Sequence, residues 1–336
     1  FYFMINFALL GAGRIGKLHA KIINNHKLAN LRFVFDTNTK LSTSLSKQYN
    51  CISTKTAFDA INSPAIDAVL IASSTPTHTK FITMSAKAGK AIFCEKPIDL
   101  NIKKVDDCWN NIKKFKVPIQ IGFNRRYDAN HSLVKKSVKA GKIGKLEMIV
   151  ITSRDPAPPP LSYLKKSGGI FRDCSIHDFD LARFILQDDP VVEVFANASV
   201  QVSKDFIKAR DYDTTMCILK SKKGVLIHIN NSRRAVYGYD QRLEVFGSKG
   251  MLVSDNISKN NVQSFNKKTS FGKNPIHHFF IERYQEAYKM QFDDFLNSII
   301  KKIKPNVSFE DGKKALIIAN SATESVKYNK LVKLKI

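Results

Sequence analysis

Cysteine is scarce in this 336-residue sequence, and its positions follow no motif. The five cysteines are odd in number and include no C-x-x-C pair; they are Cys51, Cys94, Cys108, Cys174 and Cys217. A zinc knuckle needs paired cysteines and a disulfide framework needs an even set, so neither is predicted. A reducing cytoplasm is the compartment that fits this cysteine usage best.

Long apolar runs are also missing, because no stretch approaches the ~20 consecutive apolar residues that a membrane-spanning helix needs. The apolar start, residues 1–13, has neither a basic leader nor a small-residue cleavage site, and it leads directly into a glycine turn. We therefore predict a first strand here and not a signal peptide. Position 1 is Phe and Met4 lies just inside, which suggests that residues 1–3 are not native.

Acidic residues are few beside the basic ones: 29 Asp and Glu stand against 54 Lys and Arg, for a formal net charge of +25. Such an excess raises the question of nucleic acid or an anionic membrane as a partner. Most of the excess is Lys, spread in short pairs such as Lys103-Lys104 and Lys301-Lys302. Lys suits solvated helix faces, whereas Arg is the usual choice for bidentate recognition. We interpret the excess as solvated surface and predict neither a nucleic-acid nor a membrane partner; a polyanion site remains the alternative.

Hydrophobic residues make up 43% of the chain, enough for buried cores, and the length suits about two domains of roughly 150 residues each. Up to residue 122, short apolar runs alternate with amphipathic segments. This alternation predicts βαβ units and a doubly wound parallel sheet, with a ligand at the carboxyl ends of its strands. The expected strands are 6–10, 31–35, 68–72, 91–94 and 118–121, and the expected helices are 14–25, 39–48, 78–88 and 101–114.

After Gly122 the pattern changes to alternating polar and apolar residues with turn signals between the runs. This pattern predicts an α+β domain over 123–336 with a large, mostly antiparallel open sheet, following the α/β domain over 4–122. The expected strands are 147–153, 191–202, 214–220, 224–232 and 242–246, and the expected helices are 128–139, 173–186, 279–303 and 310–328.

A glycine motif follows the first strand and opens the first helix. Gly11 permits a tight turn, Gly13 lets the backbone approach a pyrophosphate, and Gly16 lets helix and strand pack closely. Asp36 ends the second strand, where its carboxylate can accept hydrogen bonds from the ribose hydroxyls of an adenosine. The carboxylate would repel a 2′-phosphate, and Lys40 is the only cation nearby. A Rossmann domain that binds NAD is therefore favoured over one that binds NADP; a purely structural glycine turn is the other alternative.

Two further loops lie at the same edge of the predicted sheet. The loop with Thr75 and Pro76 follows the strand at 68–72 and should line the cofactor cleft, with His78 in the first turn of a helix. Glu95 and Lys96 end the strand at 91–94, where a Lys near the nicotinamide can donate a hydrogen bond or relay a proton. A surface Lys is the alternative interpretation of Lys96 taken alone.

Asp173 and His177 open an amphipathic helix and are four residues apart, so they share one face of it. The carboxylate can orient the imidazole, and a His with a pKa near the working pH can act as the base that alcohol oxidation requires. An ordinary helix-surface pair is the alternative. No metal site is predicted, because a third ligand at suitable spacing is not evident.

Taken together and in this order, the motifs resemble the glucose-fructose oxidoreductase/inositol dehydrogenase (Gfo/Idh/MocA) superfamily over essentially the whole chain. The bacterial inositol dehydrogenases of that superfamily are the closer match. The stretches that carry the resemblance are GAGRIGKLHA (11–20), AIFCEKPIDL (91–100), GFNRRY (122–127), ITSRDP (151–156), SGGIFRDCSIHDFDLARF (167–184) and NSRRAVYGYDQR (231–242).

The resemblance implies a catalytic trio: Lys96 contacts the reacting hydroxyl and the nicotinamide ribose, His177 accepts the proton, and Asp173 holds the substrate and His177. It also implies a polyol pocket lined by Arg125, Asp155 and Tyr237 or Tyr239, with Asp155 at a position where relatives carry Asn. Cys174 is expected only to pack beside Asp173. The residues it assigns to cofactor binding are Gly11, Gly13, Arg14, Ile15, Gly16, Asp36, Thr75, Pro76, Glu95 and Lys96.

The implied reaction is oxidation of the axial hydroxyl of myo-inositol to scyllo-inosose, with NAD as the hydride acceptor, in a cytoplasmic homotetramer assembled through the open sheet face. Two alternatives stay open. One is a related dehydrogenase for scyllo-inositol, D-chiro-inositol or a hexose, because the orientation of one hydroxyl is decided by details of the pocket. The other is a non-catalytic regulator that keeps the dinucleotide fold.

Overall fold

The computed structural model describes residues 4–334, which divide into two compact units. The first unit consists of residues 4–123 and Lys289–Lys314, and the second of residues 124–288 and 315–334. Residues 1–3, which the sequence suggests are not native, lie outside the described part of the chain. Each unit contains a large sheet of its own.

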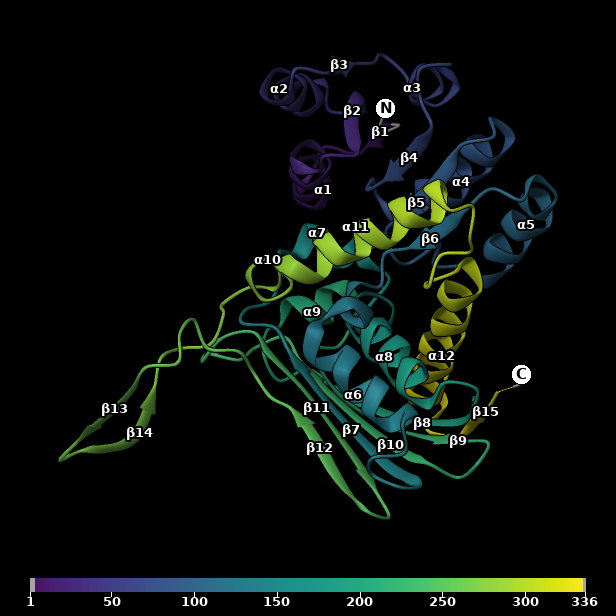
Figure 1. The fold of residues 1–336 in the computed structure, drawn as a ribbon. Helices are drawn as coiled ribbons and strands as arrows, with labels where there is room; N and C mark the ends of the chain where they lie inside the picture. The colour runs from purple at the N-terminus through teal and green to yellow at the C-terminus, as the bar shows by residue number, and fades with distance from the viewer. Residues whose placement is uncertain (1–3, 335–336) are drawn as a thin grey trace. The chain divides into compact units, whose positions relative to one another are not determined.

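A six-stranded parallel sheet forms the first unit and confirms the predicted doubly wound arrangement (Figure 1). Its order is β3-β2-β1-β4-β5-β6, and every neighbouring pair is parallel. The chain order reverses between β1 and β4, and in such sheets ligands bind at this point, outside the carboxyl ends of the strands. The strands are β1 (Ile5–Leu10), β2 (Ala29–Phe35), β3 (Ile52–Ser53), β4 (Ala68–Ile71), β5 (Ala91–Cys94) and β6 (Ile119–Ile121).

Helices connect these strands, and four of them lie where the sequence predicts helices. The two elements absent from the prediction are short: β3 has 2 residues and α3 has 6. Helix α3 begins at a capping box, in which Thr56 and Asp59 satisfy each other's backbone N–H groups. Elements this short give no clear hydrophobic period. The helices are α1 (Arg14–Asn25), α2 (Thr39–Tyr49), α3 (Ala57–Asn62), α4 (His78–Lys87) and α5 (Ile102–Ile112), with 3-10 turns η1 (Thr75–Thr77) and η2 (Lys113–Phe115).

Residues from far along the chain complete the core of the first unit. The ring of Phe292 lies 5.2 Å from that of Phe7, and the ring of Phe295 lies 5.7 Å from that of Phe93. Phe292 and Phe295 are buried and belong to helix α11 (Gln285–Ile300). The expectation that residues 4–122 form a domain by themselves stays a prediction, which a fragment lacking these two rings would test.

A seven-stranded sheet forms the second unit, in the order β12-β11-β7-β10-β9-β8-β15. Strands β7 and β10 are parallel and the other neighbouring pairs are antiparallel, which confirms a mostly antiparallel sheet. The edge strands β12 and β15 are absent from the sequence prediction. The strands are β7 (Leu146–Arg154), β8 (Val191–Ser199), β9 (Thr214–Ser221), β10 (Leu226–Ser232), β11 (Asp240–Gly247), β12 (Gly250–Ser254) and β15 (Val332–Lys333).

Two predicted helices differ in the structure. The segment expected as one helix over 279–303 forms α10 (Phe280–Arg283) and α11, because Tyr284 between them leaves helical geometry at φ −113° and ψ 18°. The segment expected as a helix from Asp173 begins with a π-helical turn, η4 (Phe171–Ser175), which continues into α8 (Ile176–Leu186).

No helix within residues 4–334 is long and apolar enough to cross a membrane. The remaining helices are α6 (Ala129–Lys139), α7 (Leu161–Ser167), α9 (Asp205–Ala209) and α12 (Phe309–Tyr328), with a 3-10 turn η3 (Asn124–Tyr127).

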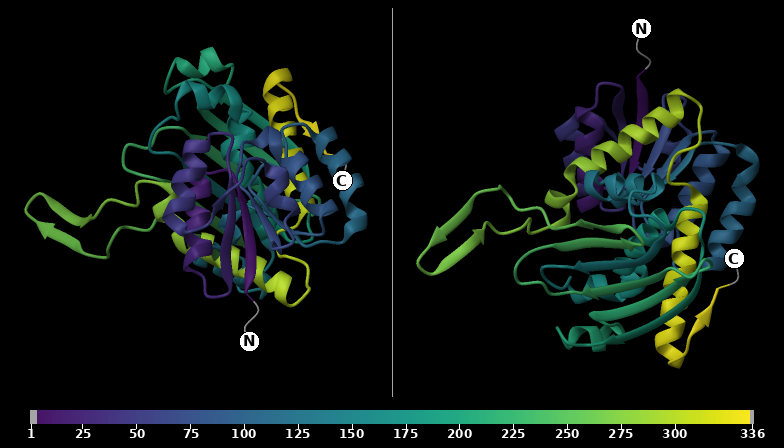
Figure 2. Two further views of the ribbon diagram at one scale, coloured as in Figure 1. Left: turned by 90° about the horizontal axis from the view of Figure 1, so that it is seen from above. Right: turned by 60° about the horizontal axis from the view of Figure 1, so that its bottom comes forward.

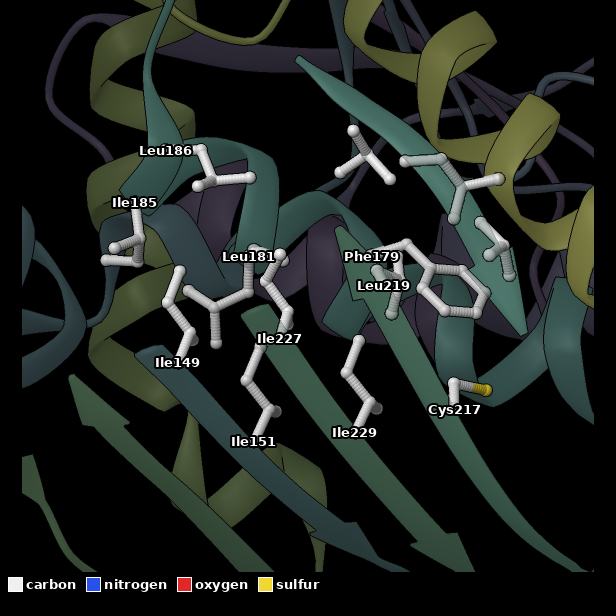
Figure 3. Packing of buried hydrophobic residues seen from close by; sticks show 14 of the residues in the cluster. Ile149, Ile151, Phe179, Leu181, Ile185, Leu186, Cys217, Leu219, Ile227 and Ile229 are labelled. Carbon is white, nitrogen blue, oxygen red and sulfur yellow. The ribbon is translucent and has the colours of Figure 1, made fainter. Parts of the chain in front are cut away.

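The core of the second unit lies between one face of its sheet and helix α8 (Figure 3). Ile149 and Ile151 of β7 and Ile227 and Ile229 of β10 contribute to this face, two residues apart on each strand as the pleat requires. The residues of α8 in the same cluster are Phe179, Leu181, Ala182, Ile185 and Leu186. The residues between the inward ones point to the opposite face of the sheet, which is called the outer face below.

A two-stranded hairpin stands out from the second unit in each view (Figures 1 and 2). It consists of β13 (Gln263–Asn266) and β14 (Thr269–Lys273). The rings of Phe265 and Phe271 contact each other at 5.2 Å, although these residues are 64% and 69% exposed. The sequence prediction lacks this hairpin, because its strands are short and mostly polar.

Candidate active site

The glycine turn after β1 has the geometry that its three glycines require. Gly11 has a φ of +103°, and a Cβ there would lie 2.5 Å from the carbonyl oxygen of Ala72. A Cβ on Gly16 would lie 2.0 Å from the carbonyl oxygen of Gly11. A Cβ on Gly13 would meet nothing within 4 Å, so this glycine faces open space. Gly11 and Gly16 are therefore required by packing, and Gly13 leaves a cradle beside the backbone.

The N-terminus of α1 fits an anion. Gly13 caps the helix without a side chain, and the first turn contains Arg14 and Ile15 but no acidic residue. The first N–H groups of a helix carry partial positive charge and attract a phosphate. Arg14 is exposed and Ile15 half-buried, so the turn is accessible from solvent. These residues fit a dinucleotide pyrophosphate.

Asp36 is held at the end of β2 by two backbone groups. Its Oδ2 accepts the N–H of Ala12 at 2.7 Å, and its Oδ1 accepts the N–H of Asn38 at 2.8 Å. The N–H of Gly11 donates to the carbonyl of Phe35 at 2.7 Å, which ties the same loop to β2. The half-buried carboxylate is thus fixed next to the glycine turn, where a ribose hydroxyl can donate to it.

His78 joins two loops at the carboxyl edge of the first sheet. The residue is buried, and its Nδ1 and Nε2 lie 2.8 and 3.0 Å from the carbonyl oxygens of Pro97 and Ser73. Burial lowers the pKa of His78, in spite of these carbonyls. Thr75 and Pro76 form the 3-10 turn η1 just before it. His78 therefore has a structural role in holding the loops that the sequence places around the cofactor.

Glu95 and Lys96 follow β5, and the peptide bond between Lys96 and Pro97 is cis. Glu95 is buried, and its Oε1 lies 2.7 Å from Nε2 of His19 in α1. A Cβ on Gly122 would lie 2.6 Å from the other carboxylate oxygen, so Gly122 leaves the space that Glu95 fills. Sequence reasoning missed His19; its only signal is its place in the GAGRIGKLHA stretch. The half-buried Lys96 thus follows a residue that is anchored to the glycine-turn helix.

In the second unit, two glycines start the segment that carries Asp173 and His177. Gly168 and Gly169 have φ values of +85° and +88°. The carboxylate of Asp211 accepts the N–H of Ile170 at 2.9 Å, which fixes the start of the helical segment. Asp173 lies in the π-helical turn η4 and His177 in α8, and both side chains are half-buried. π-turns recur at functional sites.

Asp173 contacts two residues that sequence reasoning missed. The hydroxyl of Tyr163 donates to its Oδ1 at 2.7 Å, and Arg233 donates to its Oδ2 at 2.6 Å. Arg233 also donates to Oδ2 of Asp155 at 2.7 Å. The sequence signal for Arg233 is its place in NSRRAVYGYDQR, but nothing local indicates its partners.

Arg125 belongs to a buried polar network. It pairs with Asp178 and donates to the hydroxyl of Ser153 at 3.0 Å. The side-chain amide of Asn231 donates to the other oxygen of Asp178 at 2.7 Å. Burial raises the pKa of Asp178, while Arg125 and Asn231 oppose that rise. The buried charge of Asp178 is thus paired and hydrogen-bonded, which holds the first turn of α8, where His177 directly precedes Asp178.

The two tyrosines expected at the pocket have different surroundings. Tyr239 is buried, and its ring lies edge-on to that of Tyr284 at 6.0 Å. Tyr237 is 50% exposed; its hydroxyl donates to Asp240 at 2.6 Å and accepts from Arg154 at 3.1 Å.

Cys174 packs beside Asp173 as expected. Burial raises the pKa of its thiol, which keeps the sulfur protonated and unreactive. Within residues 4–334, no three His, Cys, Asp or Glu side chains are gathered as a metal site would require.

Family models match both parts of the chain. Residues 5–123 match the model described as "Oxidoreductase family, NAD-binding Rossmann fold", and residues 131–253 match "GFO/IDH/MocA C-terminal domain". The chain belongs to the Gfo/Idh/MocA oxidoreductase family. This confirms the resemblance inferred from the motifs, and it makes NAD the cofactor of the first unit.

Curated Gfo/Idh/MocA relatives match the chain over nearly its whole length. "Inositol 2-dehydrogenase" of Rhizobium meliloti is 44% identical over 96% of this chain and 97% of its own length. "Myo-inositol 2-dehydrogenase" of Thermotoga maritima is 43% identical over 97% of this chain and 98% of its own length.

Solved structures of the family agree with this match. A structure described as a putative myo-inositol dehydrogenase from Sinorhizobium meliloti has a TM-score of 0.94 at 42% identity and covers 99% of this chain and 100% of its own. The scyllo-inositol dehydrogenase of Lactobacillus casei, solved with NAD(H) and scyllo-inositol, has a TM-score of 0.91 at 29% identity. The match covers 98% of this chain and 99% of that structure's chain.

Proposed function

We propose that this protein is an NAD-dependent dehydrogenase that oxidises myo-inositol at its axial hydroxyl to scyllo-inosose. The observation that carries the proposal is the 44% identity, over nearly the full length of both chains, to a relative named inositol 2-dehydrogenase. The pocket residues expected from the motifs support it, because they supply the carboxylates, the imidazole and the hydroxyls that suit a neutral polyol.

The first unit would hold the cofactor. The N-terminus of α1 with Gly13, Arg14 and Ile15 would bind the pyrophosphate, and Asp36 would accept hydrogen bonds from the adenosine ribose. Thr75, Pro76, Glu95 and Lys96 would border the nicotinamide end. Bound NAD+ supplies the acceptor for the hydride that leaves the carbinol carbon.

The proton chemistry is assigned to three side chains. His177 takes the hydroxyl proton as general base, Lys96 donates a hydrogen bond to the reacting oxygen, and Asp173 accepts charge from the imidazolium and holds the substrate. Lys96 belongs to the first unit and the other two belong to the second, so their meeting around one substrate is part of the proposal. Arg125, Asp155, Tyr237 and Tyr239 would line the polyol pocket.

The test is NADH formation on mixing the purified protein with NAD+ and, separately, myo-inositol, scyllo-inositol, D-chiro-inositol and glucose. The expected result is the highest kcat/KM with myo-inositol. NADH formation chiefly from another cyclitol or from glucose would move the assignment to that substrate. No NADH from any of them, together with a salt-dependent mobility shift of duplex DNA, would favour the non-catalytic regulator.

His177→Ala tests the general base. Loss of a positioned base typically costs about 10²–10⁴ in rate, so kcat should fall by that factor while the Kd for NADH stays near the wild-type value. His278→Ala is the matched control, because His278 is an exposed histidine of the same unit. A wild-type kcat for His177→Ala would remove this residue from the mechanism.

We also infer a cytoplasmic homotetramer assembled through the outer face of the second sheet. All five cysteines, each within the described range, are free thiols, which suits a reducing compartment. Apolar side chains on the outer face are 42–60% exposed, an unusual density for a surface that meets only water. They are Met148, Met216, Ile218, Leu226, Phe246, Met251 and Val253.

A further inference from the structure

Arg233 holds two acidic side chains of the candidate site in one clamp. Its Nη1 donates to Asp155 at 2.7 Å and its Nη2 donates to Asp173 at 2.6 Å. The side chains of Arg233, Asp173 and Asp155 are only 6%, 11% and 22% exposed. Both hydrogen bonds are charge-assisted and largely shielded from water, which makes them stronger than surface ion pairs.

The backbone beneath the clamp is fixed by strand pairing. Asp155 follows β7 and Arg233 follows β10, and because these strands are parallel neighbours their carboxyl ends adjoin. The N–H of Asp155 donates to the carbonyl of Ser232 at 2.9 Å, and the N–H of Arg233 donates to the carbonyl of Asp213 at 2.8 Å. The backbone that carries the Arg233 guanidinium and the Asp155 carboxylate is therefore held by hydrogen bonds to neighbouring chain segments.

The second carboxylate is held from its other side as well. The hydroxyl of Tyr163 donates to Oδ1 of Asp173 at 2.7 Å, while Arg233 donates to Oδ2. Partial burial and the Asp173 carboxylate raise the pKa of Tyr163, so its hydroxyl keeps the proton that it donates. Both oxygens of Asp173 are thus fixed in direction.

We propose that Arg233 is a positioning residue, which sets the direction of Asp155 and Asp173 and offsets their mutual repulsion. The guanidinium offsets part of the negative charge of the two carboxylates. Without the guanidinium, the two carboxylates repel each other in a poorly solvated place and turn away from the productive geometry. The catalytic part of this inference rests on the dehydrogenase function proposed above.

The kinetic test compares Arg233→Met, Arg233→Lys and a matched control, Arg126→Met. Arg126 donates to a different carboxylate, that of Asp180, in two hydrogen bonds of 2.8 and 2.6 Å, and its side chain is 10% exposed. The readouts are kcat and KM for myo-inositol and for NAD+, with circular dichroism to establish folding.

For Arg233→Met, kcat should fall by about 100-fold, the size of effect expected when a reacting group moves by about 1 Å, and the KM for NAD+ should not change. The kcat of Arg233→Lys should lie between those of the wild type and Arg233→Met, because an ammonium is a point charge and cannot donate to both carboxylates in the fork geometry. Arg126→Met should lower the Tm and keep kcat. A wild-type kcat for Arg233→Met, or an equal loss in Arg126→Met, would overturn the proposal.

A stability cycle with Asp155→Asn tests the clamp without using activity. In the wild-type background, Asp155→Asn should lower the Tm, because Arg233 loses a charged partner. In the Arg233→Met background, the same change should raise the Tm, because one of two repelling carboxylates disappears. A fall in Tm in both backgrounds overturns the clamp, whereas failure of the wild-type protein to form NADH overturns only the proposed function. If Arg233→Met does not fold but the double variant Asp155→Asn/Arg233→Met does, removing one carboxylate has stabilised the protein that lacks the guanidinium, which supports the clamp. If neither variant folds, Arg233→Lys decides: a wild-type kcat and Tm overturn the clamp, and a loss in both kcat and Tm supports it.

Discussion

Asp36 makes two backbone contacts, and in the proposed cofactor site the same side chain would select NAD. Its two oxygens accept the N–H groups of Ala12 and Asn38, so the carboxylate cannot swing away from the glycine turn. Its negative charge lies where the 2′-phosphate of NADP would lie in this fold. Thr37 and Asn38, which follow it, are exposed and offer no cation to such a phosphate. In the proposed cofactor site, Asp36 would therefore favour NAD through repulsion of the 2′-phosphate as well as through hydrogen bonding.

Asp36→Ser combined with Thr37→Arg should shift the preference from NAD toward NADP. The ratio of kcat/KM for NAD+ to that for NADP+ should fall by about tenfold or more, because a like-charge contact costs several kcal/mol and an Arg can hold a phosphate. Steady-state kinetics with the two cofactors measures the ratio. An unchanged ratio would show that the ribose does not lie at Asp36.

At the scale of elements, the turn between β1 and α1 separates two kinds of glycine. Gly16 touches the turn itself, since a Cβ there would lie 2.0 Å from the carbonyl oxygen of Gly11. Gly13 caps α1 and faces open space. Gly16 is needed for the fold of the turn, whereas Gly13 is needed only if a ligand approaches the backbone.

Gly13→Ala and Gly16→Ala should therefore fail in different ways. Gly13→Ala should keep the wild-type Tm but raise the Kd for NADH by about tenfold or more, a loss of about 1.4 kcal/mol, because the methyl group takes the space of the pyrophosphate. Gly16→Ala should lower the free energy of unfolding by about 1–3 kcal/mol, because the backbone must shift. Fluorescence titration with NADH and thermal unfolding measure the two effects. Equal NADH affinity in Gly13→Ala and the wild type would argue against a pyrophosphate at this turn.

At the scale of the whole molecule, residues from late in the chain belong to the core of the first unit. Phe292 and Phe295 pack against Phe7 and Phe93 in the first unit, although Phe93 and Phe295 are 202 positions apart in the sequence. A fragment of residues 4–122 would expose the apolar surface that these rings cover.

Phe295→Ala should lower the free energy of unfolding of the first unit by about 3–5 kcal/mol, the usual cost of truncating a buried Phe. Phe265→Ala is the matched control; this residue is 64% exposed and should change stability by no more than about 0.5 kcal/mol. Urea unfolding followed by circular dichroism measures both. Equal effects of the two substitutions would contradict the role of α11 in the core.

The proposed homotetramer, assembled through the outer face of the second sheet, is also a property of the whole molecule. Met216 and Ile218, on β9, are 60% and 55% exposed, and changing both to Lys should lower the mass in solution below that of a tetramer of 37.9 kDa chains. Burying two ammonium groups in an apolar interface without partners is costly. Leu133→Lys is the control, because Leu133 is 61% exposed but lies on α6. Light scattering after gel filtration gives the mass, and an unchanged tetramer would move the interface elsewhere.

Local patterns in the sequence determine five of the six strands of the first sheet, the glycine turn and the placement of Asp36 and Lys96 at strand ends. These features depend on neighbours within a few residues, through hydrophobic periodicity and through the backbone freedom of glycine. Resemblance across the six motif stretches adds the family and the candidate trio.

The tertiary structure alone decides which distant groups meet within each unit. His19 lies against Glu95 across 76 positions, Arg233 holds Asp155 and Asp173 across 78 and 60, and the π-helical turn at Asp173 replaces a regular helix start. No local pattern specifies such contacts, because each depends on strand pairing and on the need of a buried charge for a partner. For the same reason, only the folded chain shows that residues 289–314 complete the core of the first unit.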